Sequence, residues 1–77
     1  MVTLDEFTKN IEIELDDLES GTLTSDINYR DLEQWSSMYA LIIIAYVDSE
    51  YNVTLTGDDL RSCNTVRDLY LLIKSRV

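Results

Sequence analysis

The feature that most constrains this fold is an unbroken run of ten apolar or aromatic residues, Met38 to Val47, in a chain of 77 residues without proline. The run contains three consecutive isoleucines, which suit a strand, but its length exceeds a typical strand and predicts a helix. We expect this helix to begin at Ser36 or Ser37 and to continue to about Glu50. A helix that is apolar on every side normally lies at the centre of a domain. The run is also too short to span a bilayer.

An earlier helix is predicted by apolar residues that recur at spacings of three and four. These residues are Leu4, Phe7, Ile11, Leu15 and Leu18. Thr3 and Glu6 form a capping-box pattern at its beginning, and Gly21 is the expected left-handed stop. Ile13 falls off the apolar stripe, so we expect it to be exposed. The acidic residues are expected on the solvated side or at the C-terminal end, where they oppose the helix dipole: Glu12, Asp16, Asp17 and Glu19.

The remaining sequence predicts one long connection, residues 20–36, and two further helices. We expect the connection to be a packed crossover whose few apolar residues contact the core, with one short turn at 31–34. Residues 56–61 suit a short helix, and Thr65 with Asp68 three positions later suits the cap of a last helix. The predicted fold class is therefore all-α: a bundle of three longer helices and one short helix, with a long loop between the first two.

Composition excludes several kinds of site. The chain has no histidine and a single cysteine, Cys63, which excludes zinc clusters, internal disulfides and histidine-based catalysis. Cys63 is expected to be a small buried residue rather than a reactive thiol. We also find no phosphate-cradling glycine loop and no carboxylate pair that defines a pocket, so neither an enzyme nor a metal site is predicted.

Charge narrows the choice of partners. Fifteen acidic and six basic residues give a net charge of −9, which disfavours nucleic acids and anionic membranes as partners. Basic partner proteins fit this charge, and simple solubility explains it equally well. No signal-peptide pattern opens the sequence, and the cysteine content fits the cytoplasm, so a cytoplasmic location is expected. We expect residues 1–77 to form one domain and to be monomeric.

Three motifs, in the same order and spacing, resemble the acyl carrier protein family. Ser37-Met38 stands where the family has Ser-Leu, Tyr51-Asn52-Val53 stands where it has a Phe-Gly-Ile-like exit, and Thr65-Val66-Arg67-Asp68-Leu69 resembles the start of its last helix. Trp35 also stands where some stand-alone carriers have tryptophan. Each motif is weak alone, but together they cover the whole chain. The resemblance implies a four-helix bundle with the 38–47 segment in its central helix.

The resemblance implies a carrier rather than an enzyme. A separate phosphopantetheinyl transferase would attach 4′-phosphopantetheine from coenzyme A to Ser37 Oγ, using Mg²⁺ held in its own site. The arm would present an acyl or aminoacyl thioester to activating and acyl-transfer enzymes of a dedicated lipid, polyketide, peptide or polysaccharide-modification pathway. A space between the second and last helices could shelter a short chain, although ordinary core packing explains the same residues: Leu41, Ile44, Val66, Leu69 and Ile73.

Departures from the family affect the predicted site. Ser36 replaces the family's Asp, which removes a charge that the transferase engages and makes Ser36 a rival attachment site. The following helix has apolar residues where the family has outward acids. We expect at least two or three of them to lie on an outward strip beside Ser37: Tyr39, Ile42, Ile43 and Tyr46. The candidate docking residues are Met38, Tyr39, Ile42, Tyr46 and Asp48. The alternative function is an unmodified carrier fold that acts only as a protein-interaction module.

Overall fold

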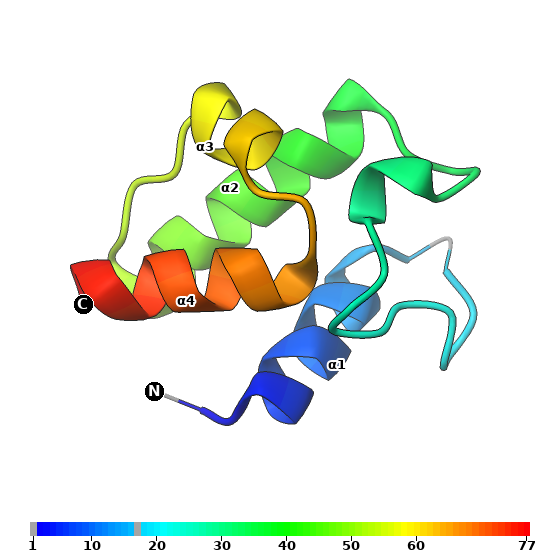
Figure 1. Ribbon diagram of the computed structural model, residues 1–77, viewed down its shortest axis with the longest axis horizontal. Coiled ribbons are helices and arrows are strands. Elements are labelled where there is room, and N and C mark those ends of the chain that lie inside the picture. The colour runs from blue at the N-terminus through cyan, green and yellow to red at the C-terminus, as the bar shows by residue number, and fades with distance from the viewer. Residues whose placement is uncertain (1, 17) are drawn as a thin grey trace.

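The computed structural model describes residues 2–16 and 18–77, and these residues form α-helices without any strand (Figure 1). In chain order the elements are α1 (Leu4–Glu14), a single 3₁₀ turn η1 (Tyr29–Asp31), α2 (Ser37–Tyr51), α3 (Gly57–Ser62) and α4 (Val66–Arg76). The all-helical prediction is therefore confirmed for the described part of the chain. Within the same residues, no helix is both long enough and apolar enough to cross a membrane.

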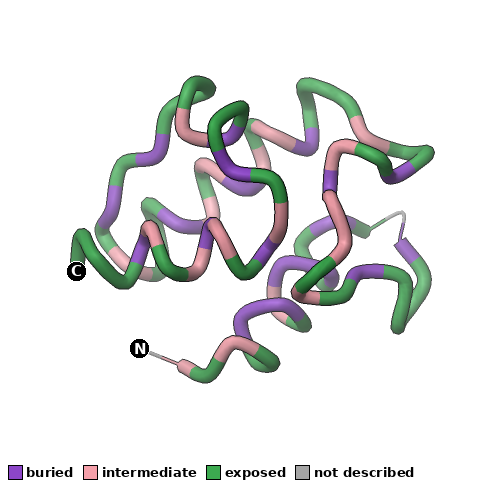
Figure 2. Tube along the Cα trace, viewed as in Figure 1, coloured by how far each residue is buried: buried purple, intermediate pink, exposed green. Residues whose placement is uncertain are grey.

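The core is formed mainly by α1, α2 and α4. Helix α1 packs against both α2 and α4, and the connection between α1 and α2 lies on the opposite side of the molecule from the C-terminus (Figure 1). The most deeply buried side chains come from these helices and from η1: Phe7, Ile11, Leu15, Tyr29, Ile43, Val47, Val66, Leu69 and Ile73. Along each helix the buried positions alternate with exposed ones (Figure 2), as expected for helices that each cover one side of a shared core.

Helix α1 is shorter than its apolar stripe predicts. The Thr3 side chain accepts the backbone N–H of Glu6, as expected for the cap, but the helix ends at Glu14. Leu15 and Leu18 are buried beyond the helix end, so the apolar spacing continues into non-helical chain. Gly21 has a left-handed φ of 90°, but in the connection rather than at the helix end, so its predicted role is wrong. Asp17 lies outside the described residues, and Ile13 is exposed as predicted.

The expectation that Glu12 faces solvent is also wrong. Its side chain is buried, and its carboxylate joins α1 to the connection. Oε1 accepts the backbone N–H of Gly21 at 3.0 Å, and Oε2 accepts that of Leu23 at 2.7 Å. A buried carboxylate is tolerated when hydrogen-bond donors surround it, and here the turn at 21–23 supplies them.

The α1–α2 connection is a packed crossover, as predicted. Leu23, Tyr29 and Leu32 are buried in it, and the 3₁₀ turn η1 lies slightly earlier than the expected turn at 31–34. Tyr29 connects η1 to the α3–α4 region, because its hydroxyl lies 2.5 Å from the Leu60 carbonyl oxygen and 2.9 Å from that of Cys63. The connection is therefore fixed to both halves of the chain despite having little regular structure.

Local capping signals fix the ends of the last two helices. Thr56 with Asp59 caps α3, and Thr65 with Asp68 caps α4, each as a reciprocal capping box. The predicted Thr65 cap is thereby confirmed. Cys63 is buried at the joint between α3 and α4, also as predicted.

Candidate functional site

Ser36 and Ser37 are both exposed where the α1–α2 connection meets α2 (Figure 2 gives the burial along this segment). Ser36 is the N-cap, with extended backbone, and its side chain makes no capping hydrogen bond. Ser37 is the first helical residue, so its hydroxyl lies beside the N-terminal turn of a fifteen-residue helix. That turn carries no acidic side chain, so no carboxylate of the turn itself compensates the positive end of the helix dipole.

Aromatic packing holds this segment in place. Trp35 is half-buried, and its ring centre lies 5.1 Å from that of Tyr29 and 6.0 Å from that of Tyr39. The Trp35 backbone N–H also donates to the Leu32 carbonyl at 3.0 Å. Ring pairs at these separations stabilise by more than their buried area alone. The residue before Ser36 is therefore anchored, while the two serines project from a fixed point.

The exposed face of α2 begins at this point. Met38 and Leu41 are 67% and 65% exposed, and Ala45 is exposed one helical turn further on. Spacings of three and four place these residues on one side of the helix, which we call the α2 ridge (Met38, Leu41 and Ala45). Asp48 is exposed at the next position of the same spacing. Met38 and Asp48 are thus outward, as the predicted docking role requires.

Part of the predicted outward strip is wrong. Tyr39 is only 5% exposed and Ile43 only 1%, so both side chains belong to the core. Ile42 and Tyr46 are half-buried and pack against the core from its edge. A helix that is apolar on every side gives no sequence signal for its inward face. The only sequence indication of the outward face was that helical spacing places Met38, Leu41 and Asp48 on the same side of the helix as Ser37.

The predicted lining of a space between α2 and α4 also needs correction. Leu41 points to solvent and cannot line it. Val66, Leu69 and Ile73 are buried in the main core, where they pack closely against neighbouring side chains, and Ile44 is half-buried. These contacts fit the alternative of ordinary core packing.

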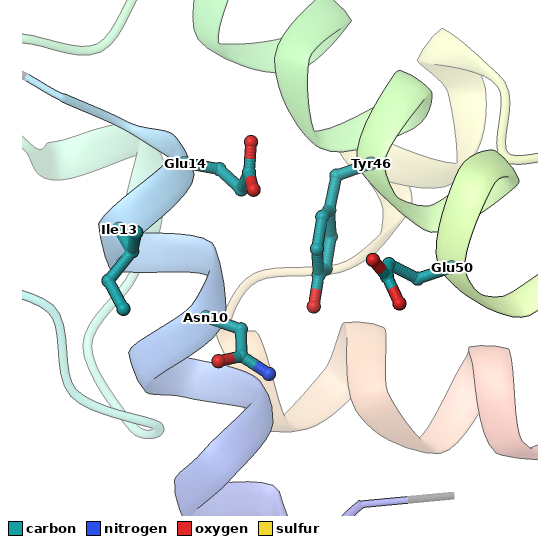
Figure 3. Close-up of a pocket in the computed structure, with 5 residues that line it drawn as sticks. All are labelled: Asn10, Ile13, Glu14, Tyr46 and Glu50. Carbon is teal, nitrogen blue, oxygen red and sulfur yellow. The ribbon is translucent and has the colours of Figure 1, made fainter.

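A cleft of about 200 Å³ lies between α1 and α2, away from the serines. Figure 3 shows Tyr46 pointing into it between the carboxylates of Glu14 and Glu50, with Asn10 at its base. Ile13, 69% exposed, borders the same cleft. Sequence reasoning did not find this cleft, because its residues come from two helices and carry no local motif.

Three ionisable side chains near the core, Cys63, Tyr29 and Tyr51, are suited to packing rather than to a chemical reaction. Burial raises the pKa of the Cys63 thiol, with the carboxylates of Asp68 and Asp59 acting in the same direction. Burial also raises the pKa of the Tyr29 and Tyr51 hydroxyls above their ordinary values. These groups stay neutral at pH 7. Among the described residues, no group of three or more metal-binding side chains is placed to hold an ion.

The most accessible reactive group at the α2 start is therefore a hydroxyl beside a helix N-terminus. Such a position can receive a group from another enzyme and can stabilise negative charge placed there. No protein-family model matches this chain, and comparison with curated proteins also gives no match.

Proposed function

We propose that this protein is a carrier that holds acyl or aminoacyl cargo on a 4′-phosphopantetheine arm attached to Ser37. The observation that supports the proposal is the exposed Ser37 hydroxyl at the first residue of α2. The spacing from this serine to the Asn52 exit and the Thr65 cap matches the family and adds support. Asn52 also adopts the left-handed conformation that the family's glycine would take.

The start of α2 fits the chemistry of a phosphodiester. A negative group at a helix N-terminus is stabilised by the helix dipole by roughly 0.3–1 kcal/mol at an exposed position. The first turn of α2 has no acidic side chain to repel it. Ser36, at the N-cap, leaves its own hydroxyl outside any capping hydrogen bond. We therefore expect the arm to attach without rearrangement of the helix.

In this proposal the chain positions the arm and carries out no chemical step itself. Ser37 supplies the attachment oxygen, and Trp35, packed against Tyr29 and Tyr39, fixes the point from which the arm extends. When attached, the arm supplies a terminal thiol that carries the cargo as a thioester. A tether raises the effective concentration of cargo at each docked enzyme, so the carrier needs no catalytic group of its own. The transferase that modifies Ser37 supplies the catalytic groups for attachment.

A labelling experiment tests the proposal. The apo protein is incubated with coenzyme A, Mg²⁺ and a broad-range phosphopantetheinyl transferase, and the modified peptide is mapped by mass spectrometry. We expect one adduct, on Ser37, that is lost in Ser37→Ala. Ser36→Ala should still be labelled, and so should Ser49→Ala, a control that removes another exposed α2 hydroxyl. An adduct on Ser36, or one that survives Ser37→Ala, would contradict the assignment.

Ser36→Asp tests whether the missing acid before Ser37 slows modification by a generic transferase. Aspartate is a good N-cap residue and adds negative charge at the positive end of α2, so folding should be preserved. We expect faster labelling than in the parent, because the substitution restores the charge found in the family. Equal or slower labelling would show that Ser36 does not limit the reaction.

A second function, an unmodified protein-interaction module, is favoured by two specific observations. The α2 ridge is apolar where the family's docking helix is acidic, and Ser36 replaces the family's Asp beside the attachment serine. Failure of every transferase tested, including that of the native host, to modify Ser37 would favour this function. Intact-mass measurement of the protein purified from its host distinguishes the two directly.

A further inference from the structure

The cleft between α1 and α2 brings together an aromatic ring and two carboxylates from distant parts of the chain. Figure 3 shows the Tyr46 ring between the carboxylates of Glu14 and Glu50, with the Asn10 amide at the base of the cleft. Ile13, 69% exposed, lies at its rim. The lining residues that the structure describes do not include those of the α2 ridge, so the cleft belongs to another side of α2.

Aromatic packing fixes the orientation of the Tyr46 ring. Its centre lies 6.1 Å from that of Tyr51, at an interplanar angle of 86°, and the Tyr51 ring lies 6.0 Å from the fully buried ring of Phe7. A ring held in this edge-to-face arrangement is already ordered before any ligand binds, which lowers the entropic cost of binding. The cleft therefore has a preformed aromatic wall.

The two carboxylates of the cleft have no cationic partner in the described part of the chain. The three ion pairs within residues 2–16 and 18–77 involve neither Glu14 nor Glu50. Both residues lie in the last turn of their helix, where α1 and α2 have no basic residue, so the negative ends of the helix dipoles add to their charge. The face of the neighbouring Tyr46 ring also attracts cations. The cleft thus favours a positively charged group.

We propose that the α1–α2 cleft receives an arginine side chain of a partner protein, with its guanidinium group against the Tyr46 ring and beside the carboxylates of Glu14 and Glu50. A guanidinium is planar, stacks on aromatic faces and donates hydrogen bonds to carboxylates, whereas the lysine ammonium is a compact and strongly hydrated charge. The aliphatic part of the arginine contacts Ile13 at the rim. The cleft lies away from Ser37, so this inference goes beyond the proposed function and does not depend on it.

Size and charge disfavour other occupants of the cleft. Its volume of about 200 Å³ is below the roughly 300–1,000 Å³ of pockets that enclose drug-sized ligands, but it suits a single side chain. A second copy of the chain has the same net charge of −9 and is repelled. Its arginines are also engaged within their own chain, three with aspartates and one with a carbonyl oxygen and an amide: Arg61 with Asp58, Arg67 with Asp26, Arg76 with Asp59, and Arg30 with Arg61 and Asn64.

A peptide titration followed by NMR tests the inference. The isotope-labelled full chain is titrated with an acetylated and amidated Gly-Arg-Gly peptide, and with the same peptide containing citrulline, which keeps the planar shape but has no charge. With the arginine peptide we expect saturable shifts of the backbone amide signals of the lining residues: Asn10, Ile13, Glu14, Tyr46 and Glu50. The citrulline peptide should cause no such shifts, and a lysine peptide should bind more weakly.

Several results of this titration would overturn the inference. These are the absence of saturable shifts, shifts confined to residues outside the cleft, equal shifts with the citrulline peptide, and equal affinity for the lysine peptide. Methylguanidinium that binds as tightly as the arginine peptide would assign the cleft to a small free cation. Shifts of the same signals on dilution of the protein alone would assign it to a second copy. Either result would exclude the arginine of a partner protein.

Matched variants test the walls of the cleft separately. Glu14→Gln and Glu50→Gln should each weaken binding of the arginine peptide by about two- to fivefold, the effect of one exposed ion pair. Glu33→Gln, at an exposed position outside the cleft, should leave the affinity unchanged. Tyr46→Phe keeps the ring and should keep the affinity, whereas Tyr46→Leu removes the ring and should lower it by a similar factor. Parent affinity in both glutamine variants, or an equal loss in Glu33→Gln, would overturn the inference even if Tyr46→Leu does not fold.

Failure of arginine binding and failure of the carrier function give different results. Ser37→Ala should bind the arginine peptide with the affinity of the parent, because the cleft lies away from the serines. If Ser37 is modified but the arginine peptide does not bind, the carrier proposal stands and the inference about the cleft is wrong. If Ser37 is never modified but binding depends on Glu14 and Glu50, the inference about the cleft stands and the carrier proposal is wrong.

Discussion

Tyr29→Phe should destabilise the fold more than the loss of one hydroxyl suggests. The Tyr29 hydroxyl is buried and lies within hydrogen-bond distance of two carbonyl oxygens, those of Leu60 and Cys63, at 2.5 and 2.9 Å. Phenylalanine keeps the ring and hence the contact with Trp35 at 5.1 Å. The substitution therefore isolates the polar contribution, with little change in the packing of the core.

The expected magnitude follows from the groups left without a partner. A single hydroxyl proton serves one carbonyl at a time, so the lost bond accounts for about 1 kcal/mol. The two carbonyls then lie buried beside an apolar ring, which adds desolvation cost, and a total of about 2 kcal/mol is expected. For a domain of this size that lowers Tm by roughly 10 °C.

Urea unfolding at pH 7, followed by circular dichroism and by the fluorescence of Trp35, the single tryptophan, measures this change. The matched control is Tyr70→Phe, whose hydroxyl donates to the Val2 carbonyl at 2.6 Å near the N-terminus, where water can replace it. The control should lose only about 0.5–1 kcal/mol. Hydrogen exchange should accelerate around α3 in Tyr29→Phe but not in the control. Loss of less than about 0.5 kcal/mol, or equal loss in both variants, would refute the argument that Tyr29 fixes the α3–α4 region.

Two other predictions follow from the charged groups. Glu12→Gln removes one of the two acceptor oxygens that the backbone N–H groups of Gly21 and Leu23 use, and should cost about 1–3 kcal/mol in urea unfolding, whereas the exposed Glu14→Gln should cost almost nothing. Equal effects would show that the carboxylate bridge contributes nothing. The Arg76 guanidinium and the Thr56 N–H lower the pKa of Asp59 to about 2, so its contribution to stability is present above the unfolded-state pKa and is lost as pH falls from about 4 toward 2. Arg76→Gln should therefore show a smaller fall in Tm between about pH 5 and pH 2 than the parent, and an unchanged fall would contradict this.

The parts of the fold that the sequence predicted depend on local signals. The Thr65 cap needs only Asp68 three positions later, and the α2 end at Asn52 needs only a residue that tolerates a left-handed conformation. Both interactions lie within a few residues of chain, so the sequence pattern contains all the information required. The position of Ser37 at the start of α2 was predicted for the same reason, since the sequence placed the helix start at Ser36 or Ser37.

The features that the sequence did not predict depend on contacts between distant residues. Glu12 is buried because the chain returns nine to eleven residues later and presents N–H groups to it. Nothing in the sequence around a glutamate at the edge of an apolar stripe indicates that such a distant contact will bury it. Leu15 and Leu18 extend the helical spacing past the real helix end, because buried connection residues need apolar side chains as much as helical ones do. Periodicity alone cannot separate the two cases.

The orientation of α2 could not be predicted for a different reason. Tyr39, Leu41 and Ile43 are all apolar, so burying any of them gains a similar free energy of transfer. The choice is made by neighbours: Trp35 and Tyr29 form one aromatic row with Tyr39, which fixes the rotation of the helix. Once Tyr39 and Ile43 face the core, helical spacing leaves Leu41 on the outside.

An exposed apolar ridge and a high net charge act at different ranges, which is why one small chain can have both. The charge of −9 repels other copies at separations up to about the Debye length, roughly 8 Å at physiological salt. The ridge acts only at contact, and the first eleven residues of α2, 37–47, are uncharged. A positively charged protein is not subject to this electrostatic repulsion, whereas another acidic copy is. In a complex formed through this surface, charge would act on the approach of the partner, and the shape of Met38 and Leu41 would act on the bound state.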